Sequence, residues 1–120
     1  MPVIKCLHAA ILTANLEQAD QFYSQILGLE TAERPLNFPG IWYQVGEFQI
    51  HLMQTSTLVR DLVNPEKWGR NRHLAFAVTD LEQLKQQLTA RHYPFQLSSS
   101  GRVAVFVQDP DGNMIELSQV

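Results

Sequence analysis

Four side chains of this sequence have the chemistry of transition-metal ligands and share one regular spacing. His8 and His73 lie 65 residues apart, and the same 65 residues separate His51 from Glu116. Imidazole and carboxylate groups suit zinc, nickel, cobalt, iron(II) or manganese better than magnesium or calcium, which prefer shells made only of oxygen. The set therefore predicts one divalent transition metal as cofactor, and the sequence leaves its identity open among these five.

The spacing of these four residues is part of a repeat that runs through the whole chain. At the same offset, Asn15-Leu16-Glu17-Gln18 meets Asp80-Leu81-Glu82-Gln83, and Ile50-His51-Leu52 meets Ile115-Glu116-Leu117. Two separate blocks that share one offset indicate a tandem duplication. We predict a single domain, 1–120, with module 1 at about 1–55, a linker at about 56–65 and module 2 at about 66–120.

Each module shows one strand pattern, one helical pattern and then three short strand patterns. Asn15 and Asp80 are suitable N-caps for the two helices, Gly28 suits the end of the first helix, and the second should end before Pro94. The expected strands are 4–12, 30–34, 41–45 and 48–54 in module 1, and 72–78, 95–98, 103–108 and 113–119 in module 2. Short connections favour antiparallel neighbours, so we expect an α+β fold of two tandem βαβββ modules that form a curved mixed sheet around a concave metal site.

Strand alternation predicts which side of the sheets carries the four candidate ligands. Side chains two residues apart share a face, and the apolar residues next to each candidate should pack on the helix. This places His8, His51, His73 and Glu116 on the face opposite the helices, at two pairs of repeat-equivalent positions. Small neighbours on that face, such as Ala10, Ala75 and Ala77, leave room for a ligand. The four candidates are therefore predicted to converge on one metal.

Several other residues are candidates for contact with a substrate. Trp42 and Gln44 are expected to share the face of His51, and Phe106 that of Glu116, although a register change of one residue would reverse each assignment. Arg70 and Arg72 precede the fifth strand, and Arg72 in particular is a candidate for an anionic substrate group. For each of these residues packing or solvation is the competing interpretation.

Composition excludes several classes of partner. The net charge of −3, with 45% hydrophobic and 18% charged residues, is typical of a globular protein and gives no basic footprint for nucleic acid. No apolar run is long enough to cross a bilayer, and the N-terminus lacks the pattern of a signal peptide. Cys6 is the single cysteine, which fits a reducing compartment. We expect a cytoplasmic protein with a small-molecule partner, no nucleic-acid partner and no membrane partner.

The paired modules, the equivalent His8 and His73, and the motif Asp-Pro-Asp-Gly-Asn-Met-Ile-Glu-Leu at 109–117 resemble the vicinal oxygen chelate superfamily. That superfamily includes glyoxalases, extradiol dioxygenases and the fosfomycin and bleomycin resistance proteins. The resemblance implies that His8, His73 and Glu116 are metal ligands, that Glu116 is also the catalytic base, and that the protein is a homodimer. His51 departs from the family pattern, because glyoxalases carry a glutamate ligand at that position.

The resemblance implies a metal-dependent, glyoxalase-like lyase or isomerase that chelates adjacent oxygens of a small substrate and transfers a proton. Two alternatives stay open. An extradiol-type dioxygenase would need iron(II) or manganese with open coordination positions, and four protein ligands leave fewer of these. A resistance-type protein would bind a small molecule without chemistry.

Overall fold

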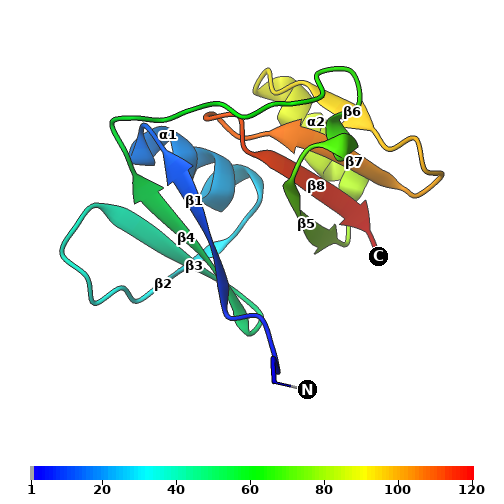
Figure 1. Ribbon diagram of the computed structural model, residues 1–120. Coiled ribbons are helices and arrows are strands. Elements are labelled where there is room, and N and C mark those ends of the chain that lie inside the picture. The colour runs from blue at the N-terminus through cyan, green and yellow to red at the C-terminus, as the bar shows by residue number, and fades with distance from the viewer. Residues whose placement is uncertain (1) are drawn as a thin grey trace. The chain divides into compact units, whose positions relative to one another are not determined.

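The computed structural model describes residues 2–120, and the chain divides after Leu58 into two compact units. We call residues 2–58 unit 1 and residues 59–120 unit 2. Each unit contains one four-stranded mixed sheet and one principal helical segment (Figure 1). The expected α+β class with two βαβββ modules is therefore confirmed.

Unit 1 begins with a strand that pairs in parallel with the last strand of the same unit. Its elements are β1 (His8–Thr13), α1 (Leu16–Asp20), the π-helical segment η1 (Gln21–Ile26), β2 (Glu30–Ala32), β3 (Gly40–Val45) and β4 (Phe48–Gln54). The sheet order is β1-β4-β3-β2, and only the β1–β4 pair is parallel. Strand β1 starts later than the expected residue 4, because its partner β4 begins at Phe48 and leaves the first residues of the chain without a strand to pair with.

Burial in unit 1 alternates along the strands as the sequence pattern indicates. Ile11 and Thr13 are buried in β1, whereas His8 and Ala10 are exposed. Ile50 and Leu52 of β4 are fully buried beneath the helix, so the intervening side chains occupy the opposite face. The core lies between the sheet and the helical segment. The candidate ligands of unit 1 therefore lie on the other face of the sheet, outside the core.

The helix of unit 1 starts as expected and then changes its geometry. The Asn15 side chain accepts a hydrogen bond from the Gln18 backbone N–H at 3.1 Å, which is the predicted N-cap. After Asp20 the turns widen, and the Leu27 N–H donates to the Phe22 carbonyl five residues earlier. A wider turn brings successive side chains closer to one direction, so Phe22 and Tyr23 are both fully buried. A regular α-helix was expected here.

Unit 2 repeats this order of elements after a single 3₁₀ turn. Its elements are η2 (Trp68–Arg70), β5 (His73–Val78), α2 (Leu81–Ala90), β6 (Phe95–Leu97), β7 (Ala104–Gln108) and β8 (Met114–Gln119). The sheet order is β5-β8-β7-β6, with β5 and β8 parallel. The Asp80 side chain caps α2 by accepting from the Gln83 N–H at 3.1 Å. Ile115 and Leu117 of β8 are buried, and Leu117 lies opposite the buried Val105 in the β7–β8 register.

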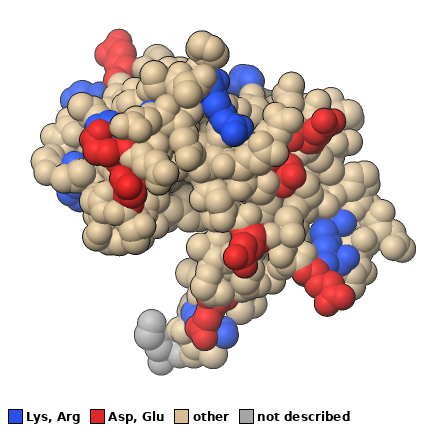
Figure 2. All heavy atoms as spheres, turned by 180° about the vertical axis from the view of Figure 1, so that it is seen from behind, with Lys and Arg blue, Asp and Glu red and all other residues tan. Residues whose placement is uncertain are grey.

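Two further observations concern possible partners. No helix among residues 2–120 is long and apolar enough to cross a membrane. On the face drawn in Figure 2, the basic side chains of the described residues are scattered among acidic ones.

Candidate functional site

In unit 1 the two candidate ligands belong to a stack of three rings that crosses three strands. The register pairs Ala10 of β1 and Trp42 of β3 with His51 of β4. The His51 ring lies between the other two, with ring centroids 4.1 Å from His8 and 4.1 Å from Trp42 and interplanar angles of 13° and 6°. Strand pairing thus places His8, His51 and Trp42 side by side on the face that does not contact the helix.

Hydrogen bonds select one tautomer of His51. Its Nε2 lies 2.8 Å from Gln49 Oε1, and the Gln49 amide nitrogen in turn donates to Gln44 Oε1 at 2.8 Å. Because the Gln49 oxygen only accepts, Nε2 carries the proton and Nδ1 keeps the lone pair. Gln44, a predicted substrate contact, therefore positions His51 through Gln49.

The charge state of His51 follows from the same surroundings. Burial lowers the pKa of His51 below its usual value, and the nearby charges of His8 and Arg34 lower it further. A neutral imidazole is the form that binds a metal. The electrostatics of unit 1 therefore keep His51 in the ligating form.

In unit 2 His73 is oriented by a backbone carbonyl. Its Nδ1–H donates to the Asn71 carbonyl at 2.7 Å, which leaves Nε2 to face Glu116 Oε1 at 3.5 Å. Asn71 is itself buried and held in place, because its side chain accepts from the Val63 and Asn64 N–H groups and donates to the Asn64 and Trp68 carbonyls. A histidine that donates one ring N–H to a fixed carbonyl is arranged as metal-ligating histidines usually are.

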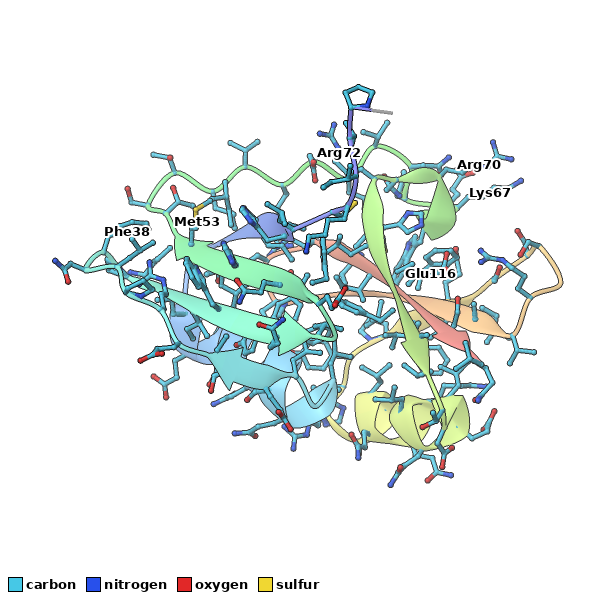
Figure 3. The ribbon with its side chains drawn as sticks, turned by 90° about the horizontal axis from the view of Figure 1, so that it is seen from below. Phe38, Met53, Lys67, Arg70, Arg72 and Glu116 are labelled. Carbon is cyan, nitrogen blue, oxygen red and sulfur yellow. The ribbon has the colours of Figure 1, made fainter. Side chains whose placement is uncertain are left out.

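Glu116 is a buried carboxylate with several donors around it (Figure 3). Arg102 donates to both carboxylate oxygens, at 3.2 Å and 3.1 Å, and Ser118 donates to Oε2 at 2.7 Å. Burial by itself raises the pKa of Glu116. The hydrogen bonds from Ser118 and Arg102 and the charges of Arg102 and His73 outweigh it, so the pKa lies below its usual value. Glu116 is therefore ionised at neutral pH.

The other predicted substrate contacts fall into two groups. Phe106 lies opposite Glu116 in the β7–β8 register and meets the His73 ring edge to face, with centroids 5.3 Å apart. Arg72 instead pairs with Asp61 at 3.2 Å on an exposed surface. Arg70 lines a pocket of about 470 Å³ in unit 2, together with Arg102 and Phe106.

Arg102 and Asn71 are the residues of the site that the sequence reasoning missed. Arg102 stands an even number of residues before Phe106, which lies opposite Glu116, so strand alternation would place it on the same face. Alternation does not identify Arg102 from the sequence alone, because this residue falls just before the expected strand 103–108. Asn71 gave no comparable signal, since its role depends on the path of the 59–72 segment.

Each unit thus brings together two of the four candidate ligands. These pairs are His8 with His51 and His73 with Glu116. Among residues 2–120, no group of three or more His, Cys, Asp or Glu side chains is arranged to hold a metal. The imidazoles of His73 and His51 and the ionised carboxylate of Glu116 fit a divalent transition metal in their donor chemistry. Convergence of both pairs on one ion stays a prediction.

Known proteins with similar sequences and folds carry related names. The chain is 27% identical to "Probable lactoylglutathione lyase" of Synechocystis sp., over 94% of this chain and 93% of that protein. A glyoxalase/dioxygenase from Nostoc punctiforme has a TM-score of 0.77 at 24% identity, covering 94% of this chain and 88% of the other. A lactoylglutathione lyase from Agrobacterium tumefaciens has a TM-score of 0.69 at 21% identity, with 99% and 96% covered.

The two structural neighbours establish the fold. The family is established by a sequence profile of a known superfamily, which matches this chain. That profile covers residues 5–117 and so includes His8, His51, His73 and Glu116. The resemblance noted from the motif at 109–117 is thereby confirmed. The chain belongs to the Glyoxalase/Bleomycin resistance protein/Dioxygenase superfamily.

Proposed function

We propose that this protein is a divalent-metal-dependent, glyoxalase-like enzyme that chelates adjacent oxygens of a small substrate and catalyses proton transfer or isomerisation. The observation that carries the proposal is the pair in unit 2, where the ionised Glu116 faces Nε2 of His73 at 3.5 Å. Family membership and the relative named as a lactoylglutathione lyase support the same reaction class.

His8, His73 and Glu116 would hold the metal, with His51 as the fourth ligand. His73 needs no change of tautomer, because the Asn71 carbonyl already holds the proton on Nδ1. His51 offers Nδ1 while Gln49 holds Nε2. A bound divalent metal would polarise the chelated substrate oxygens and stabilise the negative charge that develops when a neighbouring carbon loses its proton.

Glu116 is the proposed base and takes the proton from that carbon. Its depressed pKa ensures that it is ionised, but a carboxylate held by two arginine nitrogens is a weak base. Loss of the Arg102 contact would leave Glu116 in a buried environment, which raises the pKa of a carboxyl group and makes it a stronger base. Ser118 would continue to orient Oε2.

One observation favours a second candidate function, the binding of a small molecule without chemistry. Arg102 occupies both oxygens of Glu116, and the stacked rings of His8, His51 and Trp42 could extend their stack with an aromatic or planar ligand. An extradiol-type dioxygenase would use His8, His73 and Glu116 and leave His51 bonded to Gln49.

The test is metal content followed by activity. Protein purified without an affinity tag is analysed for bound metals, and hemithioacetal isomerisation is then assayed with each metal. We expect a bound transition metal and measurable turnover, because each unit supplies one pair of the proposed ligands and unit 2 also supplies the proposed base. A protein that neither retains nor binds zinc, nickel, cobalt, iron or manganese would overturn the metal-dependent proposal and leave sequestration.

A matched pair of variants tests the role of Glu116. Glu116→Gln removes the charge and the proton acceptor, so turnover should fall by at least about 100-fold, the range expected for loss of a general base. Glu47→Gln changes an exposed glutamate in the β3–β4 turn and should retain turnover. Full activity of Glu116→Gln would exclude Glu116 as the base. We also expect a homodimer, which sedimentation of the purified chain measures.

A further inference from the structure

A pocket of about 470 Å³ lies within unit 2, beside the candidate ligands. One wall is the segment around η2, with Lys67, Gly69 and Arg70, and the opposite wall is the β6–β7 connection, with the serines at 98–100 and Arg102. The Phe106 ring, which contacts His73, also lines it. The pocket therefore adjoins the residues that we propose to hold metal and substrate.

The η2 wall is fixed to the sheet by specific contacts. Gln96 of β6 accepts from the Trp68 N–H at 2.9 Å and donates to the Glu66 carbonyl at 2.9 Å. A Cβ on Gly69 would lie 2.7 Å from the Phe106 ring, so only glycine allows this close approach. These contacts hold the backbone of the wall in place without a bound ligand.

The pocket has an excess of positive charge. Three cationic side chains line it, Lys67, Arg70 and Arg102, against the single carboxylate of Glu66. Figure 3 shows Lys67 and Arg70 extending from the same side of the η2 segment. Among residues 2–120, neither Lys67 nor Arg70 has a carboxylate within ion-pair distance. Two free cations next to serine hydroxyls are the chemistry that binds a carboxylate or phosphate group.

Arg102 connects this pocket to Glu116. Its two terminal nitrogens hold the carboxylate, and its Nε donates to Ser100 Oγ at 3.1 Å. The side chain of Arg102 is 58% exposed, whereas that of Glu116 is 6% exposed. When the pair separates, the arginine is therefore the member that is free to move, and Glu116 stays in place.

We propose that Arg102 exchanges between two anionic partners and so couples metal binding to ligand binding. Without a metal, its guanidinium neutralises Glu116. When Glu116 binds a metal, Arg102 turns into the pocket and, with Lys67 and Arg70, binds an anionic group of the small-molecule ligand. The inference rests on the proposed function of Glu116 as a metal ligand, and it adds that the ligand carries a carboxylate or phosphate.

Coupling of this kind is reciprocal, which gives it a measurable signature. An anion in the pocket draws Arg102 away from Glu116 and should raise metal affinity, and a bound metal should raise anion affinity by the same factor. Coupling between two sites in proteins commonly spans about 5-fold to 150-fold, and for one exchangeable arginine we expect about tenfold. A structural role of Arg102 as a support for Glu116 predicts no such dependence.

The experiment measures zinc affinity of the full chain by calorimetry. Titrations are run in chloride alone, with sulfate as a tetrahedral dianion, and with acetate as a carboxylate, at one constant ionic strength. Sulfate or acetate should lower the zinc Kd about tenfold. A response to sulfate alone indicates a phosphate-like group, and a response to acetate alone indicates a carboxylate. No response to either anion would overturn the coupling.

Variants separate exchange from support. Arg102→Gln should bind zinc more tightly than the parent in chloride, because the competitor for Glu116 is gone, and it should lose the effect of the anion. Arg70→Gln should also lose the anion effect. Arg91→Gln, a matched change beyond the end of α2, should behave as the parent. If Arg102→Gln binds zinc more weakly, Arg102 is a support and the proposal is wrong.

Two further outcomes keep the test decisive. If Arg102→Gln does not fold, Arg102→Lys keeps the charge but cannot bridge both oxygens, and it should reduce the anion effect while retaining a native circular dichroism spectrum. If the parent binds no zinc or other divalent transition metal, the proposed function fails together with this inference. Zinc binding without an anion effect overturns only the inference.

Discussion

Units 1 and 2 each hold a pair of candidate ligands at equivalent strand positions. The side chains around the two pairs differ. In unit 1 the His8–His51 pair is part of an aromatic stack, and burial and neighbouring charges keep His51 neutral. In unit 2 Glu116 of the His73–Glu116 pair is ionised, and Arg102 and Ser118 donate to its carboxylate. The repeated backbone thus determines the positions of the candidate ligands, and the neighbouring side chains determine their protonation states.

The largest expected consequence of this difference concerns metal affinity. Glu116→Gln removes the anionic ligand and should lower zinc affinity by at least about 100-fold. Even the loss of a residue that only hydrogen-bonds to a metal ligand typically lowers metal affinity by about 10-fold to 100-fold. His51→Gln removes a neutral ligand whose ring also belongs to a stack, and it should cost about tenfold or less. Competition with a chromophoric chelator measures both values.

The outcome of this pair of variants decides how unequal the units are. Equal losses would mean that both pairs contribute alike and that the stack in unit 1 does not weaken His51 as a ligand. A larger loss in His51→Gln would reverse the comparison. Thermal melting of both metal-free variants serves as the control, because unfolding of either one would lower its apparent affinity without any change at the site.

The positions of the candidate ligands on the strands could be predicted from the sequence because they depend on short-range rules. Alternation along β1, β4, β5 and β8, together with one offset that relates the halves, was sufficient to choose the face opposite the helices. The register confirms it locally, with Trp42 opposite His51 and Phe106 opposite Glu116. These pairings follow from hairpins whose turns are visible in the sequence.

The remaining features depend on long-range or subtle geometry. Asn71 acts through four hydrogen bonds to a segment without regular structure, and nothing in the sequence pattern indicates that path. The change from α1 to η1 involves a difference of one residue in hydrogen-bond spacing, which the apolar stripe does not distinguish. Arg102 lies two residues before the start of β7 at Ala104, and strand boundaries are the least certain part of a prediction.

A smaller effect is expected where the two helical segments end. Unit 1 turns at Gly28 with a φ of 75°, and unit 2 turns at His92 with a φ of 63°. A side chain in this left-handed region costs about 1 kcal/mol. His92→Gly should therefore stabilise the protein by about 1 kcal/mol, and Gly28→Ala, which meets no neighbouring atom within 4 Å, should destabilise it by a similar amount.

Urea denaturation of the two variants and the parent measures both changes. His92 is exposed, so the loss of its side chain removes little packing. An unchanged midpoint for His92→Gly would show that the imidazole has a compensating interaction at the end of α2. Opposite signs for the two variants would confirm that the left-handed turn favours glycine at the end of both helical segments.

The smallest expected effect is the pH dependence of the free energy of unfolding of the metal-free protein. The pH range in which stability is lost should differ between the group in unit 1 and the group in unit 2. The pKa of His51 is lowered by burial, His8 and Arg34, so the unfolded chain binds a proton there more readily than the folded one. The free energy of unfolding should fall as the pH drops from 6.5 through the folded pKa of His51. The pKa of Glu116 is also lowered, so its contribution is lost only as the pH falls below 4.5.

Denaturation at a series of pH values, with one variant from each unit, separates these two windows. His51→Gln should flatten the decline just below pH 6.5 and leave the decline below pH 4.5, and Glu116→Gln should do the reverse. Both windows exist because the groups are held in the ligating form, neutral for the imidazole and ionised for the carboxylate. If His51→Gln leaves the upper window unchanged, the stack does not disfavour protonation, and the contrast between the units reduces to the carboxylate and its arginine.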